Sequence, residues 1–132
     1  MAAERRWQPA PAPAGLPAPA GAYSPAIRAG DFVYVSGQVP KNPATGELEG
    51  DDIRSQTRRV LEKLRLTLEA AGASLDDVVS VNAYLEDEND WVAFNEVYKQ
   101  TFRPPYPTRT TVGARLRDVL VEISAVAYVG KR

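Results

Sequence analysis

The sequence contains neither cysteine nor histidine. Without cysteine the chain has no disulfide, no thiolate nucleophile and no Cys-ligated zinc. Without histidine, Ser-His-Asp catalysis, histidine-based nucleases and most transition-metal sites are excluded. Any acid–base chemistry must therefore use the side chains of Asp, Glu, Tyr or Lys.

Net charge and long apolar runs are also scarce. The chain has 16 basic and 17 acidic residues, which argues against nucleic acid as a partner because such binding is usually driven by a basic patch. No apolar run approaches the ~18 residues of a membrane span, and no targeting signal is identifiable, so we expect a cytoplasmic protein away from membranes. The 132 residues, 44% of them hydrophobic, fit one domain whose remaining apolar surface favours an oligomer.

The first part of the chain is dominated by proline and alanine, with prolines at positions 9, 11, 13, 17 and 19. Prolines at every second or third position favour extended conformers over helix. We therefore expect a flexible or extended N-terminal arm over residues 1–21 and a single folded domain over residues 22–132.

The rest of the chain alternates the patterns of strands and helices. We expect strands over residues 23–30, 31–36, 78–85, 108–112 and 119–129, and helices over residues 53–71 and 91–102. A hairpin turn is expected at Gly30, Asp51 or Asp52 is expected to cap the first helix, and Asn89 or Asp90 the second. A short strand at residues 47–48 is a further possibility. The order β-β-α-β-α-β-β indicates an α+β fold.

The last expected strand has two different faces. Val121, Ile123, Ala125 and Ala127 point to one side, where we expect the helices, while Glu122 and its alternate neighbours point to the other. That second face is largely apolar and the chain has no further element to cover it. Self-association is the natural way to bury it.

Two charged residues stand out within strands. Arg109, at the start of a strand, is able to grip a carboxylate through two parallel hydrogen bonds, although a structural ion pair is the commoner role. Glu122 lies between apolar residues, where desolvation would raise its pKa towards a range useful for proton transfer. The alternative for Glu122 is a solvated sheet edge or an ion pair at a subunit interface.

Several weaker candidates have simple structural explanations. Ser36-Gly37 would let a ligand approach the backbone, or it forms a β-bulge. Tyr23 is a hydrogen-bond donor or an aromatic anchor for the arm, and Asn95 is a ligand contact or a solvated helix position. Schiff-base chemistry is set aside because no lysine, Lys63 included, lies in an apolar stretch that would depress its pKa.

Taken together, several segments resemble the Rid (YjgF/YER057c/UK114) family. They occur in the family's order from about residue 21 to the end of the chain. The matching segments are AYS at 22–24, AGD at 29–31, VSGQVP at 35–40, NPATGE at 42–47, EAAGA at 69–73, PTRTTVG at 107–113 and VEI at 121–123.

The resemblance implies a chorismate-mutase-like α+β fold with two helices on one face of a mixed sheet. It also implies a homotrimer whose sheets form a central barrel, with a site in each cleft between neighbouring subunits. The implied activity is the hydrolysis of 2-aminoacrylate-type enamines and imines to 2-keto acids and ammonia, with no cofactor and no metal. Small 2-imino and 2-keto acids are the implied ligands.

The resemblance also assigns roles to residues. Arg109 matches the arginine that holds the substrate carboxylate, and Glu122 matches the glutamate that positions or activates water. Thr111 stands where many members have cysteine, which changes the polarity of the pocket. The remaining matches to pocket positions are Tyr23, Ser36, Gly37 and Asn95.

Two other functions fit the same residues. A non-catalytic binder or sensor of keto acids would need the arginine but not the glutamate. A ribonuclease or translation inhibitor is the third reading, and the missing histidines and the near-zero net charge count against it. The exact substrate stays open, with 2-aminomuconate as one variant.

Overall fold

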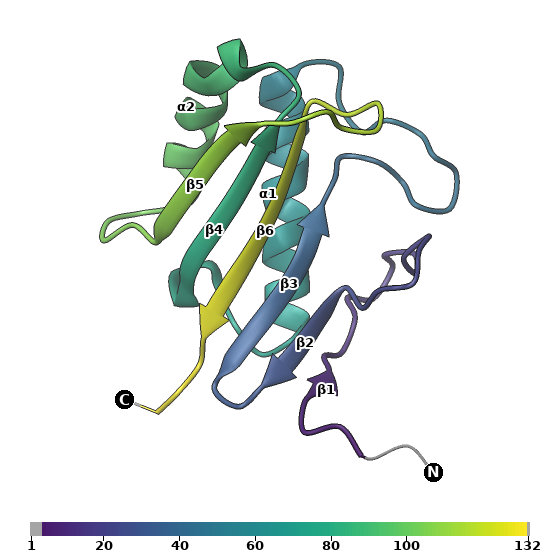
Figure 1. The fold of residues 1–132 in the computed structure, drawn as a ribbon, viewed down its shortest axis with the longest axis vertical. Coiled ribbons are helices and arrows are strands. Elements are labelled where there is room, and N and C mark those ends of the chain that lie inside the picture. The colour runs from purple at the N-terminus through teal and green to yellow at the C-terminus, as the bar shows by residue number, and fades with distance from the viewer. Residues whose placement is uncertain (1–3, 132) are drawn as a thin grey trace.

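The computed structural model describes residues 4–131 and shows one mixed six-stranded sheet with two helices on one of its faces (Figure 1). The strand order is β1-β2-β3-β6-β4-β5, and only the β4–β5 pair is parallel. The strands are β1 (Gln8–Pro9), β2 (Ala26–Ala29), β3 (Phe32–Gln38), β4 (Val78–Leu85), β5 (Thr108–Gly113) and β6 (Val121–Tyr128). The helices are α1 (Ile53–Ala70) and α2 (Trp91–Thr101), with short 3₁₀ turns at Leu75–Asp77 and Glu88–Asp90.

The predicted α+β order is confirmed, and so are most of its local signals. Gly30, with φ of 59°, begins the two-residue turn between β2 and β3, where a hairpin of this kind favours glycine. Asp52 caps α1, and its carboxylate accepts a hydrogen bond from the Ser55 amide at 2.8 Å. Asp90 precedes α2, but its side chain makes no capping hydrogen bond. Asp87 instead accepts from the Asn89 amide at 2.9 Å and starts the 3₁₀ turn before α2.

The N-terminal arm is extended where the structure describes it, as the prolines predict, but part of it also joins the sheet. Gln8 and Pro9 pair with β2 in antiparallel register, and the Ala10 amide donates to the Ala26 carbonyl at 3.0 Å. No strand was predicted here, because two residues are too few to show a period. Pro9 is tolerated because β1 is an edge strand. On the side away from β2 there is no neighbouring strand that would need the missing N–H of the proline. The possible strand at residues 47–48 is only a single bridge between Lys41 and Leu48.

The two faces of the sheet differ as the last strand predicts. Val121, Ile123, Ala125 and Ala127 are at most 4% exposed and pack under the helices. On the opposite face the aromatic residues Phe32 and Tyr128 pack edge to face at 5.3 Å yet remain 38% and 43% exposed. No helix within residues 4–131 is long and apolar enough to cross a membrane. Residues 4–131 of one chain therefore leave an apolar face of the sheet uncovered.

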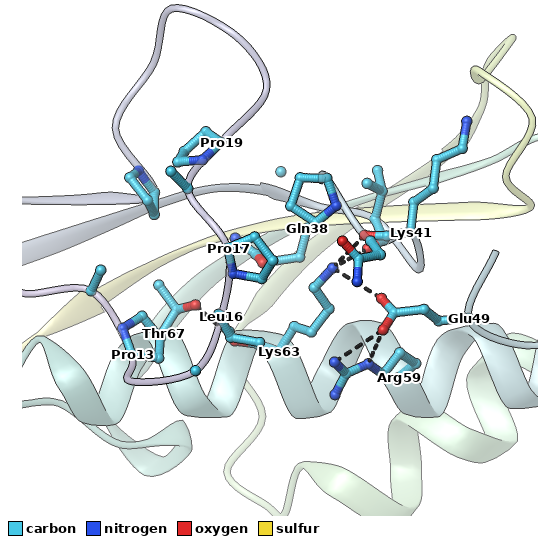
Figure 2. Close-up of a pocket in the computed structure, with 18 of the residues that line it drawn as sticks. Pro13, Leu16, Pro17, Pro19, Gln38, Lys41, Glu49, Arg59, Lys63 and Thr67 are labelled. Carbon is cyan, nitrogen blue, oxygen red and sulfur yellow. Dashed lines mark hydrogen bonds and ion pairs between the residues drawn. The ribbon is translucent and has the colours of Figure 1, made fainter. Parts of the chain in front are cut away.

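A buried lysine fastens the β3–α1 loop to the first helix (Figure 2). The Lys63 ammonium donates to the carbonyls of Val39 and Lys41, both at 2.9 Å, and lies 3.3 Å from the Glu49 carboxylate. Burial lowers the pKa of Lys63, and Glu49 opposes that effect. The expectation that no lysine has a depressed pKa was wrong for Lys63, because the loop that buries this residue is distant in sequence. Since its three donors are occupied, Lys63 is a structural cation rather than a nucleophile.

We expect Lys63→Met to lower the free energy of unfolding by about 3 kcal/mol, because the change leaves two carbonyls and a carboxylate without their donor. Urea unfolding followed by circular dichroism at fixed protein concentration measures the loss. The matched control is Lys99→Met on the exposed face of α2, which should change stability by less than about 0.5 kcal/mol. Equal effects of the two variants would contradict the structural role of Lys63.

Candidate functional site

The predicted site residues fall into two groups on opposite faces of the sheet. We call the first group the arginine half-site and the second the glutamate half-site. The arginine half-site consists of Asn95, Arg109 and Thr111. The glutamate half-site consists of Tyr23, Ser36, Gly37 and Glu122.

Strand register decides to which face the two charged residues point. Arg109 pairs with Val81, which is 1% exposed beneath the helices, so the arginine projects towards α2. Glu122 pairs with Tyr84 and alternates with the buried Val121, so it projects to the open face. A single subunit therefore does not bring the guanidinium and the carboxylate together.

The guanidinium of Arg109 lies among aromatic rings of α2. Its central carbon is 4.5 Å from the ring centroid of Tyr98, 5.4 Å from that of Trp91 and 5.5 Å from that of Phe94. One terminal nitrogen donates to the Asn95 side-chain oxygen at 2.9 Å. No carboxylate within residues 4–131 pairs with Arg109. A partly buried cation with unused donors is a strong site for an anion.

Thr111 lies two residues further along β5 and therefore on the same face as Arg109. It pairs with Ala83, which is fully buried under the helices. The Thr111 hydroxyl is buried and has no hydrogen-bond partner among residues 4–131. The residue thus adds a polar atom to the apolar wall of the arginine half-site.

The three rings around Arg109 lie on α2, for which the sequence predicted only a helix. Trp91, Asn95 and Tyr98 are spaced i, i+4 and i+7, which places them on one side of α2. That spacing contained the signal that the amide and the rings share a surface. The missing information was that β5 packs beside this surface with Arg109 pointing at it.

In the glutamate half-site, the Glu122 side chain lies across Gly37 of the neighbouring strand. A Cβ atom added to Gly37 would overlap the Glu122 carboxylate, so the glycine leaves the space that this group occupies. Burial raises the pKa of Glu122. The carboxylate makes no hydrogen bond or ion pair within the described part of the chain, so no cation compensates its burial there.

Ser36 and Gly37 form the predicted β-bulge. Both stand opposite Ser124, because Val35 pairs with Ala125 and Gln38 pairs with Ile123. The Ser36 hydroxyl donates to the Ser24 carbonyl at 2.6 Å and ties the chain next to Tyr23 to β3. The Tyr23 side chain is 55% exposed, so the structure does not bury it as an anchor of the arm.

A pocket of about 440 Å³ lies between the arm and α1 and touches Tyr23 and Gly37 from the side (Figure 2). Pro13, Leu16 and Pro17 form one wall, and polar residues of α1 and the β3–α1 loop form the other. Two of its three cations, Arg59 and Lys63, bind Glu49, Arg59 at 3.1 Å, and the third, Lys41, lies 4.0 Å from the Asp118 carboxylate. The charges of Arg59 and Lys63 are committed to holding the loop on the helix. Elsewhere in residues 4–131 no group of three or more acidic side chains is placed to hold a metal ion.

The fold and these half-sites define a class that comparison with known proteins identifies. A family model described as Endoribonuclease L-PSP matches residues 14–129. A RutC family protein of Pyrococcus horikoshii is 51% identical over 85% of this chain and 90% of the relative. The chain belongs to the Rid (YjgF) family.

Named deaminases also appear among its relatives. A protein of Dermatophagoides farinae named 2-iminobutanoate/2-iminopropanoate deaminase is 38% identical over 86% of this chain and 90% of its own length. The crystal structure of Escherichia coli TdcF with bound serine has a TM-score of 0.80 and 38% identity, over 87% of this chain and 94% of that one. The predicted fold is therefore confirmed at the level of family and architecture.

The raised pKa of Glu122 predicts a stability cost near neutral pH. The folded chain holds this proton more tightly than the unfolded chain, so the stability from the protonated group is present at low pH and is lost as pH rises through the folded pKa. We expect Glu122→Gln to be more stable than wild type at pH 7 and the difference to shrink below about pH 4, near the ordinary Glu pKa. Urea unfolding at a series of pH values measures it.

The control for this measurement is the exposed Glu47→Gln. Its stability difference from wild type should stay near zero across the same pH range, because its carboxylate makes no ion pair within residues 4–131. If the difference in free energy of unfolding between Glu122→Gln and wild type does not change with pH, burial does not destabilise the ionised Glu122.

Proposed function

We propose that this protein hydrolyses reactive 2-imino acids of the 2-aminoacrylate type to 2-keto acids and ammonia. In the proposed homotrimer, the arginine half-site of one subunit faces the glutamate half-site of its neighbour. The observation that carries the proposal is a matched pair of uncompensated charges. Arg109 has no carboxylate partner and Glu122 has no cationic partner within the described chain, and the exposed apolar sheet face needs a neighbour.

The chemistry requires little activation by the protein. Arg109 binds the substrate carboxylate through paired hydrogen bonds and fixes the imine carbon in place. Glu122 accepts a proton from a water molecule as the water oxygen attacks the electrophilic imine carbon. This proton then passes to the nitrogen and gives a tetrahedral intermediate that carries a hydroxyl and an amino group. Glu122 next transfers the hydroxyl proton to the amino nitrogen as the C–N bond breaks, which releases ammonia and leaves the carbonyl of the keto acid. A carboxyl group of raised pKa suits both proton transfers.

The relatives support the reaction class more strongly than the substrate. The mite relative is named for 2-iminobutanoate and 2-iminopropanoate, whereas the archaeal relative has only a family name. The words "Endoribonuclease L-PSP" describe the family model. A ribonuclease role for this chain is disfavoured by the absence of histidine and by the net charge of −1. We therefore propose imine hydrolysis as the reaction. A panel of 2-imino acids with side chains of different lengths would identify the substrate.

A coupled assay tests the proposal, with a dehydratase that generates 2-aminoacrylate and with pyruvate formation as the readout. We expect wild type to accelerate pyruvate release. Arg109→Ala and Arg109→Lys should each lose about 100-fold or more in kcat/KM, since alanine has no cation and the ammonium of lysine cannot form the paired contact. The control is Arg65→Ala, which removes only a surface pair with Glu69 on α1. No acceleration by wild type, or full acceleration by Arg109→Ala, would overturn the proposal.

The same assay separates an enzyme from a keto-acid binder. Glu122→Gln should bind pyruvate as wild type does in a calorimetric titration, yet lose most of its acceleration. Unchanged turnover in Glu122→Gln would favour a site that binds without proton transfer by this residue. RNA cleavage that disappears in the same variant would revive the ribonuclease reading.

A mixing experiment tests whether each site spans two subunits. Arg109→Ala and Glu122→Gln are each expected to be inactive alone. When the two variants are refolded together, roughly a quarter of wild-type activity should return, because each mixed trimer regains one site with both residues intact. Solution mass by light scattering checks the trimer. Activity that stays at background in mixed trimers would place both residues in the same subunit's site or outside any site.

A further inference from the structure

We infer that Tyr98 is a positioning residue for Arg109, and that the face of its ring holds the guanidinium flat with its edge turned towards the ligand. The inference rests on the proposed function, since it concerns the carboxylate that Arg109 binds. Tyr98 is a buried residue of α2. Its distance to the guanidinium is the shortest among the three aromatic contacts of Arg109, at 4.5 Å.

The Tyr98 ring is itself a rigid support. It is 3% exposed and stacks on Phe102 with centroids 4.6 Å apart and an interplanar angle of 29°. The Phe94 ring also packs against the Tyr98 ring, with centroids 5.7 Å apart and an interplanar angle of 41°. A ring packed in this way cannot turn without disturbing the core of α2, so the surface it offers to Arg109 is fixed.

Stacking and carboxylate binding use different parts of the guanidinium. The guanidinium carbon lies over the Tyr98 ring in a cation–π contact. When a guanidinium stacks on a ring in this way, its N–H donors point outward in its own plane and stay available to a ligand. Asn95 accepts from one terminal nitrogen and thereby sets the rotation of the group in that plane. The remaining donors have no acceptor within residues 4–131. Tyr98 and Asn95 together therefore fix both the tilt and the rotation of Arg109 and leave one edge available.

The ring rather than the hydroxyl carries this role. The Tyr98 hydroxyl is buried without a hydrogen-bond partner in the described chain. Burial raises the pKa of this phenol more than the neighbouring Arg109 guanidinium lowers it, so the phenol stays neutral and adds no charge near Arg109. Phenylalanine at this position keeps the supporting face, whereas leucine fills a similar space without a π system.

The test measures binding and turnover separately in Tyr98→Leu and Tyr98→Phe. We expect Tyr98→Leu to weaken pyruvate binding and to raise KM roughly tenfold, the size expected of one partly desolvated cation–π contact. Turnover at saturating substrate should change much less, because Glu122 and the water are untouched. Tyr98→Phe should restore both values to those of wild type.

Phe102→Leu is the matched control. It removes a ring from the same aromatic cluster, one that stacks on Tyr98 but has no cation–π contact with Arg109. It should lower thermal stability as Tyr98→Leu does, with a smaller effect on KM.

The inference is overturned if Tyr98→Leu binds pyruvate as wild type does, if Tyr98→Phe fails to rescue, or if Phe102→Leu shifts KM equally. A wild-type protein that neither binds pyruvate nor accelerates its release would instead refute the proposed function. The two failures are therefore distinguishable.

Discussion

Side chains alternate between the two faces of a β-strand, and this constraint decides where every charged residue of the sheet lies. Helices α1 and α2 cover one face only, so residues in register with Val81 point into helix packing and residues in register with Tyr84 point away from it. Arg109 follows the first row and Glu122 the second. The helices thus supply aromatic support to the arginine, while the glutamate is left to a face that one subunit cannot cover.

The glutamate half-site shows how the sheet accommodates a costly group. A carboxylate at the end of an apolar strand loses hydration, and burial raises its pKa accordingly. Gly37, within the bulge, has no side chain and leaves the space that Glu122 occupies. At this position the sheet therefore loses regular β3–β6 pairing, and the Glu122 carboxylate loses solvation. Such a combination is expected where function rather than stability selects the residue.

Much of the fold was predictable because its signals are local. Period-two and helical spacings indicated β4, α1 and α2, and alternation along β6 indicated its buried face. Charged residues within strands indicated Arg109 and Glu122, and the family pattern supplied their roles and added Thr111. Strand β1 was missed because a two-residue strand has no period, and burial of Lys63 was missed because residues 39–49 cover it from a distance in sequence. Packing of Arg109 against α2 was missed for the same reason, since it depends on which helix lies beside β5.

Two partly or fully buried cations of this chain illustrate how donor accounting separates structure from function. Lys63 has three donors and three acceptors, all supplied by the loop that it holds, and nothing is left for a ligand. Arg109 has five donors and one acceptor within residues 4–131, and its guanidinium lies against aromatic rings that offer it no acceptor oxygen or nitrogen. An arginine held this way loses little freedom when a carboxylate arrives, because its geometry is already set. A site assembled from two subunits needs this rigidity, since the partner half-site is positioned only by the fit of one sheet face to another.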